Sequence, residues 1–322
     1  MKRHLLHIIF LFLAATAFAQ QPVQYSLHMF NRMAYNPAYA GLDNSLSMTG
    51  VFRKQWLNLE GSPTSQHFNI HSPLPFIRSG FGLVFQNDEL GVEQNMNLSA
   101  AYNYQLPVGQ TGVLSLGFGG GIIQKRLDGS AIRTRDGEYT DGNLPNHNDP
   151  VLASTEVLGS APMIEVGVYY KSEAFEAGFA VKDILEQPIV STVVSIIPIR
   201  SYFFNAAAHI DLTDAIALHP SVFFKSDILE TQADFSVLFS YNDNISLGAS
   251  FRGYSQNTAD AVAILGGLRL SEKIKLFYSY DMTLSDINTV STGSHEIMIN
   301  YNLNKDFGRG VPPPIIYNPR NL

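Results

Sequence analysis

Residues 95–106 read NMNLSAAYNYQL, and this stretch decides how the chain folds. The even-numbered positions carry Met, Leu, Ala, Tyr, Tyr and Leu, whereas the odd-numbered positions carry Asn, Asn, Ser, Ala, Asn and Gln. Successive side chains of a β-strand lie on opposite faces, whereas an α-helix repeats every 3.6 residues. The stretch therefore predicts a strand with one apolar face and one face of amide and small side chains.

The same alternation recurs along most of the chain, for example at 244–252, 273–284 and 294–303. Marking every such run predicts about fourteen strands. Their expected spans are 45–54, 63–72, 79–87, 92–106, 111–125, 160–171, 174–183, 199–212, 215–225, 229–242, 244–252, 258–270, 273–284 and 292–303. A run of ~11 residues at ~3.3 Å per residue, tilted by about 40°, rises about 28 Å, the height of the apolar band of an outer membrane. The pattern predicts an all-β fold, a transmembrane antiparallel up-and-down β-barrel over 45–303.

The predicted connections separate into two classes, and this separation supports a barrel. Connections after the even-numbered strands are short: 73–78, 107–110, 172–173, 213–214, 243 and 271–272. Connections after the odd-numbered strands include all the long ones: 55–62, 126–159, 184–198, 253–257 and 285–291. Outer-membrane barrels have short periplasmic turns and long extracellular loops. The alternative, a soluble two-sheet sandwich, also alternates but does not sort its connections in this way.

The N-terminus carries a predicted export signal. Lys2 and Arg3 precede an apolar run at 8–13, and residues 17–19 (Ala-Phe-Ala) have the small-x-small pattern of a cleavage site. This order is typical of a secretory signal peptide, and the apolar run is too short to span a bilayer. We therefore expect residues 1–19 to be removed. No Cys follows the cleavage site, so a lipoprotein anchor is not expected.

Two segments flank the predicted barrel, and both are expected in the periplasm. Residues 20–44 form a predicted N-terminal periplasmic segment that is too short for a folded plug domain. Residues 304–322 contain three consecutive prolines at 312–314 and a further proline, Pro319. Because proline cannot donate a strand hydrogen bond, this stretch is predicted to be a C-terminal periplasmic tail. Both termini are therefore predicted to be periplasmic.

The composition fits a membrane barrel and argues against other classes. The chain has a net charge of −7, only 15% charged residues, 21 Phe, 15 Tyr and a mean hydropathy of +0.02. In a barrel only alternate residues face lipid, so the mean hydropathy stays near zero. An acidic balance without basic runs argues against nucleic acid as a partner.

No motif for catalysis or metal binding is evident in the sequence. The chain contains no Cys, no Gly-x-Ser-x-Gly and no His-Glu-x-x-His. His67 and His71 share a strand face, but four residues along a strand cover about 13 Å, which is too far for one metal ion. The Asp-Gly dipeptides of 126–159 lack the ligand spacing of an EF-hand and are typical of turns. We therefore expect no enzyme activity, no cofactor, no metal and no small-molecule substrate.

Two stretches are rich in aromatic, proline and glycine residues without alternation. One is 35–41 (YNPAYAG), before the first predicted strand, and the other is 53–64 (RKQWLNLEGSPT), across the first long loop. Anchoring at the membrane interface by the only Trp would explain the second stretch. Docking of a protein partner would explain it equally well, since Trp, Tyr and Arg dominate binding hot spots. The candidate docking residues are Arg53, Trp56, Leu57, Leu59 and Glu60, with loop 126–159 as a second part of this surface.

These stretches resemble the PorP/SprF family of type IX secretion system outer-membrane proteins. The resemblance covers nearly the whole chain after the predicted signal peptide, in order. The motifs that carry it are Gln24-Tyr25-Ser26, Met29-Phe30-Asn31, 35–41, Arg53-x-Gln55-Trp56, 60–64, Gly80-x-Gly82, Asp88-x-x-Gly91, Gly167-Val168-Tyr169-Tyr170, Phe175-x-Ala177-Gly178, Tyr280-Asp281 and Ser294-His295-Glu296-Ile297. The family has no known catalytic residues, so the resemblance implies none here.

The resemblance implies a barrel in the outer membrane that works with the type IX apparatus. Such a barrel belongs to the secretion or gliding machinery, or it supports export or surface attachment of a secreted cargo protein such as an adhesin. A passive porin or solute channel is the alternative. A porin would have a lumen ringed with fixed charges, whereas the inner faces here are mostly Ser, Asn, Gly and Ala. A hydrophobic-solute channel would need an N-terminal plug, which residues 20–44 are too short to provide. Because no charge ring is evident and the long loop 126–159 can fold over the mouth, we expect a barrel that does not conduct appreciably on its own.

Overall fold

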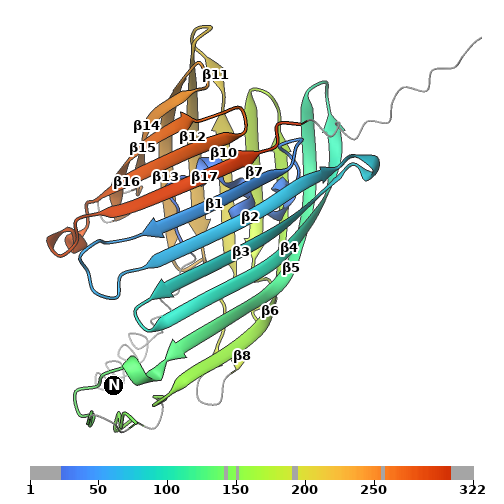
Figure 1. Cartoon of the computed structure of the whole chain (residues 1–322). Helices are drawn as coiled ribbons and strands as arrows, with labels where there is room; N and C mark the ends of the chain where they lie inside the picture. The colour runs from blue at the N-terminus through green and yellow to red at the C-terminus, as the bar shows by residue number, and fades with distance from the viewer. Residues whose placement is uncertain (1–22, 141–143, 150–151, 191–194, 255–257, 306–322) are drawn as a thin grey trace, which may run out of the picture.

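The computed structural model describes residues 23–140, 144–149, 152–190, 195–254 and 258–305. Within these residues, fourteen antiparallel strands close into a barrel (Figure 1). The wall strands are β1 (Ser47–Lys54), β2 (Thr64–Leu74), β3 (Ser79–Leu90), β4 (Glu93–Val108), β5 (Gly112–Asp128), β6 (Glu156–Lys171), β7 (Phe175–Lys182), β10 (Ser201–Ala208), β12 (Ile216–Ser226), β13 (Thr231–Tyr241), β14 (Ile245–Arg252), β15 (Ala261–Arg269), β16 (Ile274–Thr283) and β17 (Ser294–Asn302). The short β11 (Ile210–Asp211) continues β10, and β8 (Ile189–Val190) pairs with β9 (Ser195–Ile196) in a separate sheet.

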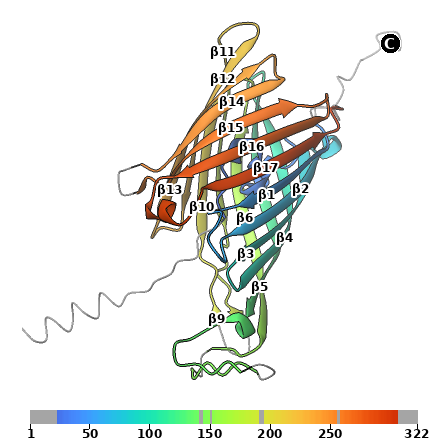
Figure 2. The same ribbon diagram turned by 60° about the vertical axis from the view of Figure 1, so that its left-hand side comes forward.

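Each wall strand pairs with the wall strands that precede and follow it in the sequence, and the ring closes between its first and last members (Figure 2). β1 pairs with β17 from Ser47↔Asn302 to Lys54↔His295. β10 pairs with β12 from Tyr202↔Ser226 to Ala207↔Ser221, and the short β11 between them pairs with the start of β12. The predicted fold class is confirmed, and each predicted strand overlaps one observed wall strand.

The stretch at 95–106 forms most of β4 and shows which face of the barrel is apolar. Leu98, Tyr102 and Tyr104 are 58%, 45% and 44% exposed, whereas Ala101 and Asn103 are 1% and 0% exposed. The apolar face therefore points outward, where lipid would cover it, and the polar face points into the lumen. A soluble sheet would have the opposite arrangement.

The wall is taller on one side of the barrel than on the other. β4, β5 and β6 contain 16, 17 and 16 residues, whereas β1 and β7 contain 8 each. The long strands carry the wall past its neighbours toward the connection 129–155 (Figure 1). The predicted loop 126–159 is therefore too long at both ends, because β5 continues to Asp128 and β6 already begins at Glu156.

The connections give the barrel two different mouths. We call the mouth with the long connections the loop mouth; it carries 55–63, 129–155, 183–200, 227–230, 253–260 and 284–293, together with the short turn 91–92. We call the opposite mouth, where β1 begins and β17 ends, the turn mouth. The predicted sorting of long connections to one side of the barrel is therefore confirmed for the described residues.

Residues 23–44, here called the lumen segment, lie inside the barrel. Leu27, Ala38 and Ala40 of this segment are 0% exposed. It contains three single-turn helices, η1 (His28–Phe30), η2 (Arg32–Ala34) and η3 (Pro37–Tyr39), and no helix of the described chain is long and apolar enough to cross a membrane. The sequence predicts a periplasmic segment too short for a folded plug domain; residues 23–44 form no such domain, but they lie in the lumen and not outside the barrel. The segment has no core of its own, but it buries its side chains against the wall.

The two ends of the described chain lie at opposite mouths. Val23 lines a cavity at the loop mouth together with Trp56, whereas the backbone N–H of Leu303 donates to the carbonyl of Leu46 at the turn mouth. The two termini themselves lie outside the described residues, so their predicted periplasmic location stays a prediction. The predicted signal peptide and most of the predicted tail at 304–322 lie outside the described residues.

Candidate functional site

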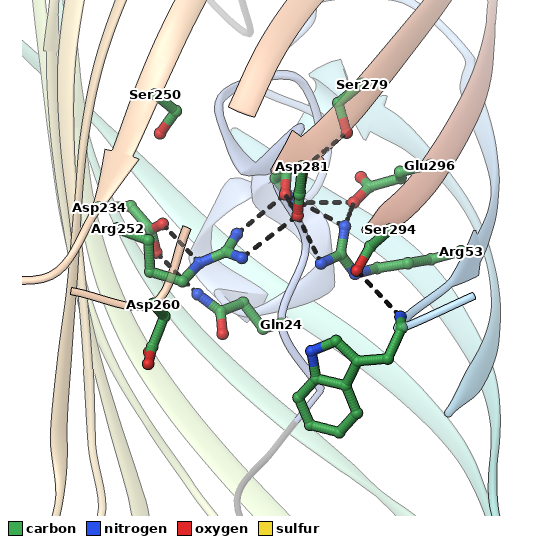
Figure 3. A network of polar contacts seen from close by, with 12 residues as sticks. Gln24, Arg53, Asp234, Ser250, Arg252, Asp260, Ser279, Asp281, Ser294 and Glu296 are labelled. Atoms are coloured by element: carbon green, nitrogen blue, oxygen red, sulfur yellow. Dashed lines mark hydrogen bonds and ion pairs between the residues drawn. The ribbon is translucent and has the colours of Figure 1, made fainter. Parts of the chain in front are cut away.

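The lumen segment is held near the loop mouth by charged side chains of the wall (Figure 3). The carboxylate of Glu296 accepts hydrogen bonds from the backbone N–H groups of Ser26 at 2.7 Å and Leu27 at 3.1 Å. The hydroxyl of Ser26 donates to Asp281 at 2.6 Å. Arg53 bridges the two carboxylates, with 3.0 Å to Glu296 and 2.7 Å to Asp281. These hydrogen bonds join Ser26 of the lumen segment to three neighbouring strands, through Arg53 of β1, Asp281 of β16 and Glu296 of β17.

A second arginine completes this cluster from the other side. Arg252 donates to Asp234 at 2.9 Å, to Asp281 at 3.2 Å and to the hydroxyl of Ser26 at 2.8 Å. Gln24 of the lumen segment also donates to Asp234, at 3.2 Å. We call the five charged wall residues the latch: Arg53, Asp234, Arg252, Asp281 and Glu296.

The latch is buried and its charges nearly balance. Its three carboxylates face two guanidinium groups, and the exposure of the residues ranges from 0% for Arg53 and Glu296 to 5% for Arg252. Ser26 donates one hydrogen bond and accepts two, from Arg53 and Arg252, which uses the full capacity of a hydroxyl. Removing one partner of a buried ion pair typically costs about 3–5 kcal/mol, because the other charge is left uncompensated. Loss of one latch residue is therefore expected to weaken the attachment of the lumen segment to the wall.

Aromatic stacking holds the middle of the lumen segment. The ring of Phe30 stacks on Phe277 with 3.8 Å between centroids, and His28 stacks on Phe223 at 4.8 Å. Tyr35 also packs against Phe223, at 4.7 Å. Burial lowers the pKa of His28 to about 4, so its ring is neutral at neutral pH. The segment thus crosses the lumen as a packed element.

The end of the lumen segment near the turn mouth is bound through its backbone. Asn36 caps η3 by accepting from the N–H of Ala38 at 2.9 Å, while its amide donates to two wall carbonyls. The amide of Asn103 on β4 donates to the carbonyls of Ala38 at 2.8 Å and Ala40 at 2.6 Å. A Cβ atom on Gly117 of β5 would lie 2.3 Å from the backbone nitrogen of Ala38. Only glycine therefore lets the segment approach the wall this closely.

Asp43 ends the lumen segment in a charged contact at the turn mouth. Its carboxylate lies 3.4 Å from Lys171 and 3.5 Å from His71, and it accepts from the hydroxyl of Tyr39 at 2.7 Å. Burial alone would raise the pKa of Asp43, but Lys171, His71 and Tyr39 together hold it well below its usual value. Asp43 is therefore ionised at neutral pH and fixes the segment just before β1 begins.

The comparisons with known proteins identify the family. The model of the family described as type IX secretion system membrane protein PorP/SprF matches residues 17–301. The chain belongs to the PorP/SprF family. The latch and the lumen segment both lie within the matched range. Fold and family together make this PorP/SprF chain an outer-membrane protein associated with the type IX secretion system.

Several solved structures are similar to this PorP/SprF chain, whereas no curated protein matches it. Omp33 of Acinetobacter baumannii is 7% identical, with 80% of this chain and 97% of that chain covered and a TM-score of 0.43. The toluene transporter TbuX of Ralstonia pickettii is 10% identical, with 84% and 92% covered and a TM-score of 0.48. The KdgM porin is 8% identical, with 79% and 98% covered and a TM-score of 0.36.

The predicted docking residues of this PorP/SprF chain do not form one surface. Arg53 is fully buried in the latch, so its assignment to an outward docking surface is wrong. Trp56 and Leu57 are half-buried in the connection 55–63, whereas Leu59 and Glu60 are exposed at the loop mouth. The other stretch without alternation, 35–41, lies in the lumen.

Backbone bonds fix the connection that carries Trp56. The N–H of Leu57 donates to the carbonyl of Gly293, and the N–H of Thr292 donates back to the carbonyl of Leu57. The N–H of Trp56 donates to the hydroxyl of Ser294 at 3.1 Å. Two neighbouring connections therefore act as one unit at the loop mouth. Among the described residues, no group of three or more His, Cys, Asp or Glu side chains is placed to hold a metal ion.

Proposed function

We propose that this barrel is a closed scaffold of the type IX secretion system that holds a secreted partner at its loop mouth. The observation that carries the proposal is the latched lumen segment, which fills the space that a porin leaves open. An outer-membrane barrel without an open lumen is suited to binding rather than to bulk transport. In this proposal the partner is a cargo protein of the secretion system, retained at the cell surface.

The loop mouth faces the cell exterior in this proposal, and the turn mouth faces the periplasm. Long connections lie outside and short turns lie inside in bacterial outer-membrane barrels. In this proposal the tail 304–322, which follows β17 at the turn mouth, lies in the periplasm. The first described residue, Val23, lies on the outer side, where the connection 55–63 is also displayed.

A gated solute channel is the second candidate function. The sequence disfavours such a channel because it predicts no plug, yet the lumen segment lies where a plug would sit. Cavities of about 390 Å³ at the turn mouth and about 390 Å³ at the loop mouth lie on either side of it. If the segment moved aside, these cavities would join. Conductance measurements separate this candidate from the scaffold.

Export to the outer membrane is the first expected result. Residues 1–19 should be missing from the mature protein, and the protein should fractionate with the outer membrane. The intact mass of protein extracted from the membrane fraction measures both. A product that stays in the soluble periplasmic fraction would refute the membrane assignment.

Trp56→Ala should release the secreted partner while the amount of folded barrel stays normal. Truncation of a Trp at an interface typically costs more than ~2 kcal/mol, which is ~30-fold in affinity. The readout is the amount of secreted protein that co-purifies with the barrel. Phe76→Ala is the matched control, because Phe76 is 100% exposed at the turn mouth.

The same variant tests the competing role of Trp56 as a membrane anchor. In that case Trp56→Ala would lower barrel abundance or the temperature of its heat-induced gel shift, and partner retention per barrel would not change. Unchanged retention would show that the connection 55–63 does not dock the partner.

A further inference from the structure

A cavity of about 390 Å³ opens at the loop mouth, and its lining is acidic. We call it the vestibule. The lumen segment contributes Val23 and Gln24 to it, and the connection 55–63 contributes Trp56. Five carboxylate side chains line the vestibule: Asp88, Glu89, Glu230, Asp260 and Asp281. Against them stand two cationic side chains, Lys225 and Arg252. The lining therefore carries a negative excess.

Part of this negative charge is not matched by a cation. Asp281 is paired with Arg53 and Arg252 in the latch. By contrast, Asp88 accepts from the amide of Gln86 at 2.6 Å, and Asp260 accepts from the amide of Gln232 at 3.2 Å. Glu89 accepts from two further amides. Amide donors satisfy the hydrogen bonds of a carboxylate but supply no positive charge, so the carboxylates of Glu89 and Asp260 face no cation in these bonds.

One carboxylate of the vestibule is buried with an unused oxygen. Asp88 is 9% exposed, and its Oδ1 atom has no hydrogen-bond partner among the described residues. The hydroxyl of Tyr25, which is 7% exposed, also has none, and the two side chains share the adjoining cavity. A buried polar atom without a partner is costly. Asp88 therefore offers a preformed acceptor to a donor that enters from the loop mouth.

Besides the carboxylates, the aromatic ring of Trp56 also favours the binding of cations at the vestibule. It is the only Trp of the chain and lies half-buried at the vestibule. The face of an indole ring attracts ammonium and guanidinium groups. Charge, an unused acceptor and an aromatic face thus favour the same chemistry.

We propose that the vestibule binds a lysine- or arginine-bearing segment of the secreted partner. This inference rests on the proposed docking function and specifies its chemistry. The volume of the vestibule admits a long side chain with part of a peptide backbone. Among the described residues, no group of three or more acidic or imidazole side chains is placed to bind a metal ion there. An acidic segment would be repelled by the same lining.

The single Trp makes binding directly measurable. The probes are acetylated, amidated hexapeptides of Gly with two Arg, two Lys, two citrulline or two Glu residues, titrated into the full-length barrel in detergent. The Arg and Lys peptides should change the Trp fluorescence saturably, and salt should weaken their binding. The proposal is overturned if these peptides give no saturable change or if the citrulline or Glu peptides bind equally well.

Charge removal gives the matched test. The double substitution Asp88→Asn/Glu89→Gln should weaken binding of the Arg peptide by about tenfold or more, the usual scale for lost charge-assisted bonds. The control Asp214→Asn/Glu272→Gln removes two exposed carboxylates at the turn mouth and should leave binding unchanged. Equal effects of the two pairs would mean that net charge, not the vestibule, attracts the peptide. An unchanged heat-induced gel shift confirms that each variant is folded.

A measurement of how much secreted partner the barrel retains in cells distinguishes a failure of this inference from a failure of the docking proposal. If Asp88→Asn/Glu89→Gln loses the peptide but keeps the partner, the vestibule does not bind the partner and the present inference is wrong. If it loses both, the inference is supported. If the native barrel retains no partner at all, the docking function itself fails, whatever the peptide result.

Discussion

Removing residues 23–44 should turn the barrel from a closed protein into a conducting pore. In planar bilayers the intact mature chain should give no resolvable current steps, whereas the deletion variant should give discrete ones. The reason is geometric, because the lumen segment crosses the barrel from the latch to Asp43 and packs against the wall along the way. A barrel of this size encloses more space than wall side chains alone fill.

The deletion needs a control for folding, because the segment also supports the wall. Heat-induced gel shift shows whether the deletion variant still forms a barrel. Ser26→Pro provides a milder change, because it removes the N–H that donates to Glu296 and the hydroxyl at the centre of the latch. In planar bilayers the Ser26→Pro variant should give intermittent current steps. Steady, large, ion-selective steps from the intact chain would instead favour the porin.

Arg53→Met should be the most destabilising single substitution in the latch. It leaves Asp281 and Glu296 close together without the guanidinium that bridges them. Loss of one partner from a buried ion pair typically costs about 3–5 kcal/mol. The temperature of the heat-induced gel shift should fall clearly, and adding Glu296→Gln should restore part of the loss.

Arg126→Met is the matched control for this substitution. Arg126 pairs with Glu156, but their side chains are 48% and 50% exposed. Exposed ion pairs typically contribute about 1 kcal/mol or less. If the two substitutions lower the gel-shift temperature equally, burial of the latch does not stabilise the barrel.

The wall of the barrel was predictable because its signal is local. The alternation at 95–106 requires only that one face meets lipid and the other the lumen, and β4 follows it residue by residue. Arg53 could have been placed correctly by the same rule. It belongs to the predicted strand 45–54, two residues after Val51, which points into the lumen. The alternation of this strand therefore predicts a lumen position for Arg53, not a position in the following connection.

The lumen segment could not be predicted from its own residues. Its stability comes from partners far along the chain; Ser26 and Glu296, for example, are 270 positions apart. Because the segment has no core of its own, its apolar residues follow neither a strand nor a helix period, and the sequence pattern is typical of a loop. Two indirect signals were present in the sequence. The stretch 35–41 is rich in residues with special backbone geometry, and Gly117 on β5 leaves room for a backbone to approach.

Cross-linking of the lumen segment to the wall tests the central claim most directly. Asn31 and Asn69 contact each other at 2.6 Å across the lumen interface, and the chain contains no Cys. The pair Asn31→Cys/Asn69→Cys, treated with a short bifunctional thiol reagent in intact outer membranes, should become cross-linked. The pair Thr49→Cys/Asn300→Cys, which joins facing positions of β1 and β17, is the positive control. A cross-link in both pairs is the result expected for a plugged barrel; a cross-link in the control alone would contradict it.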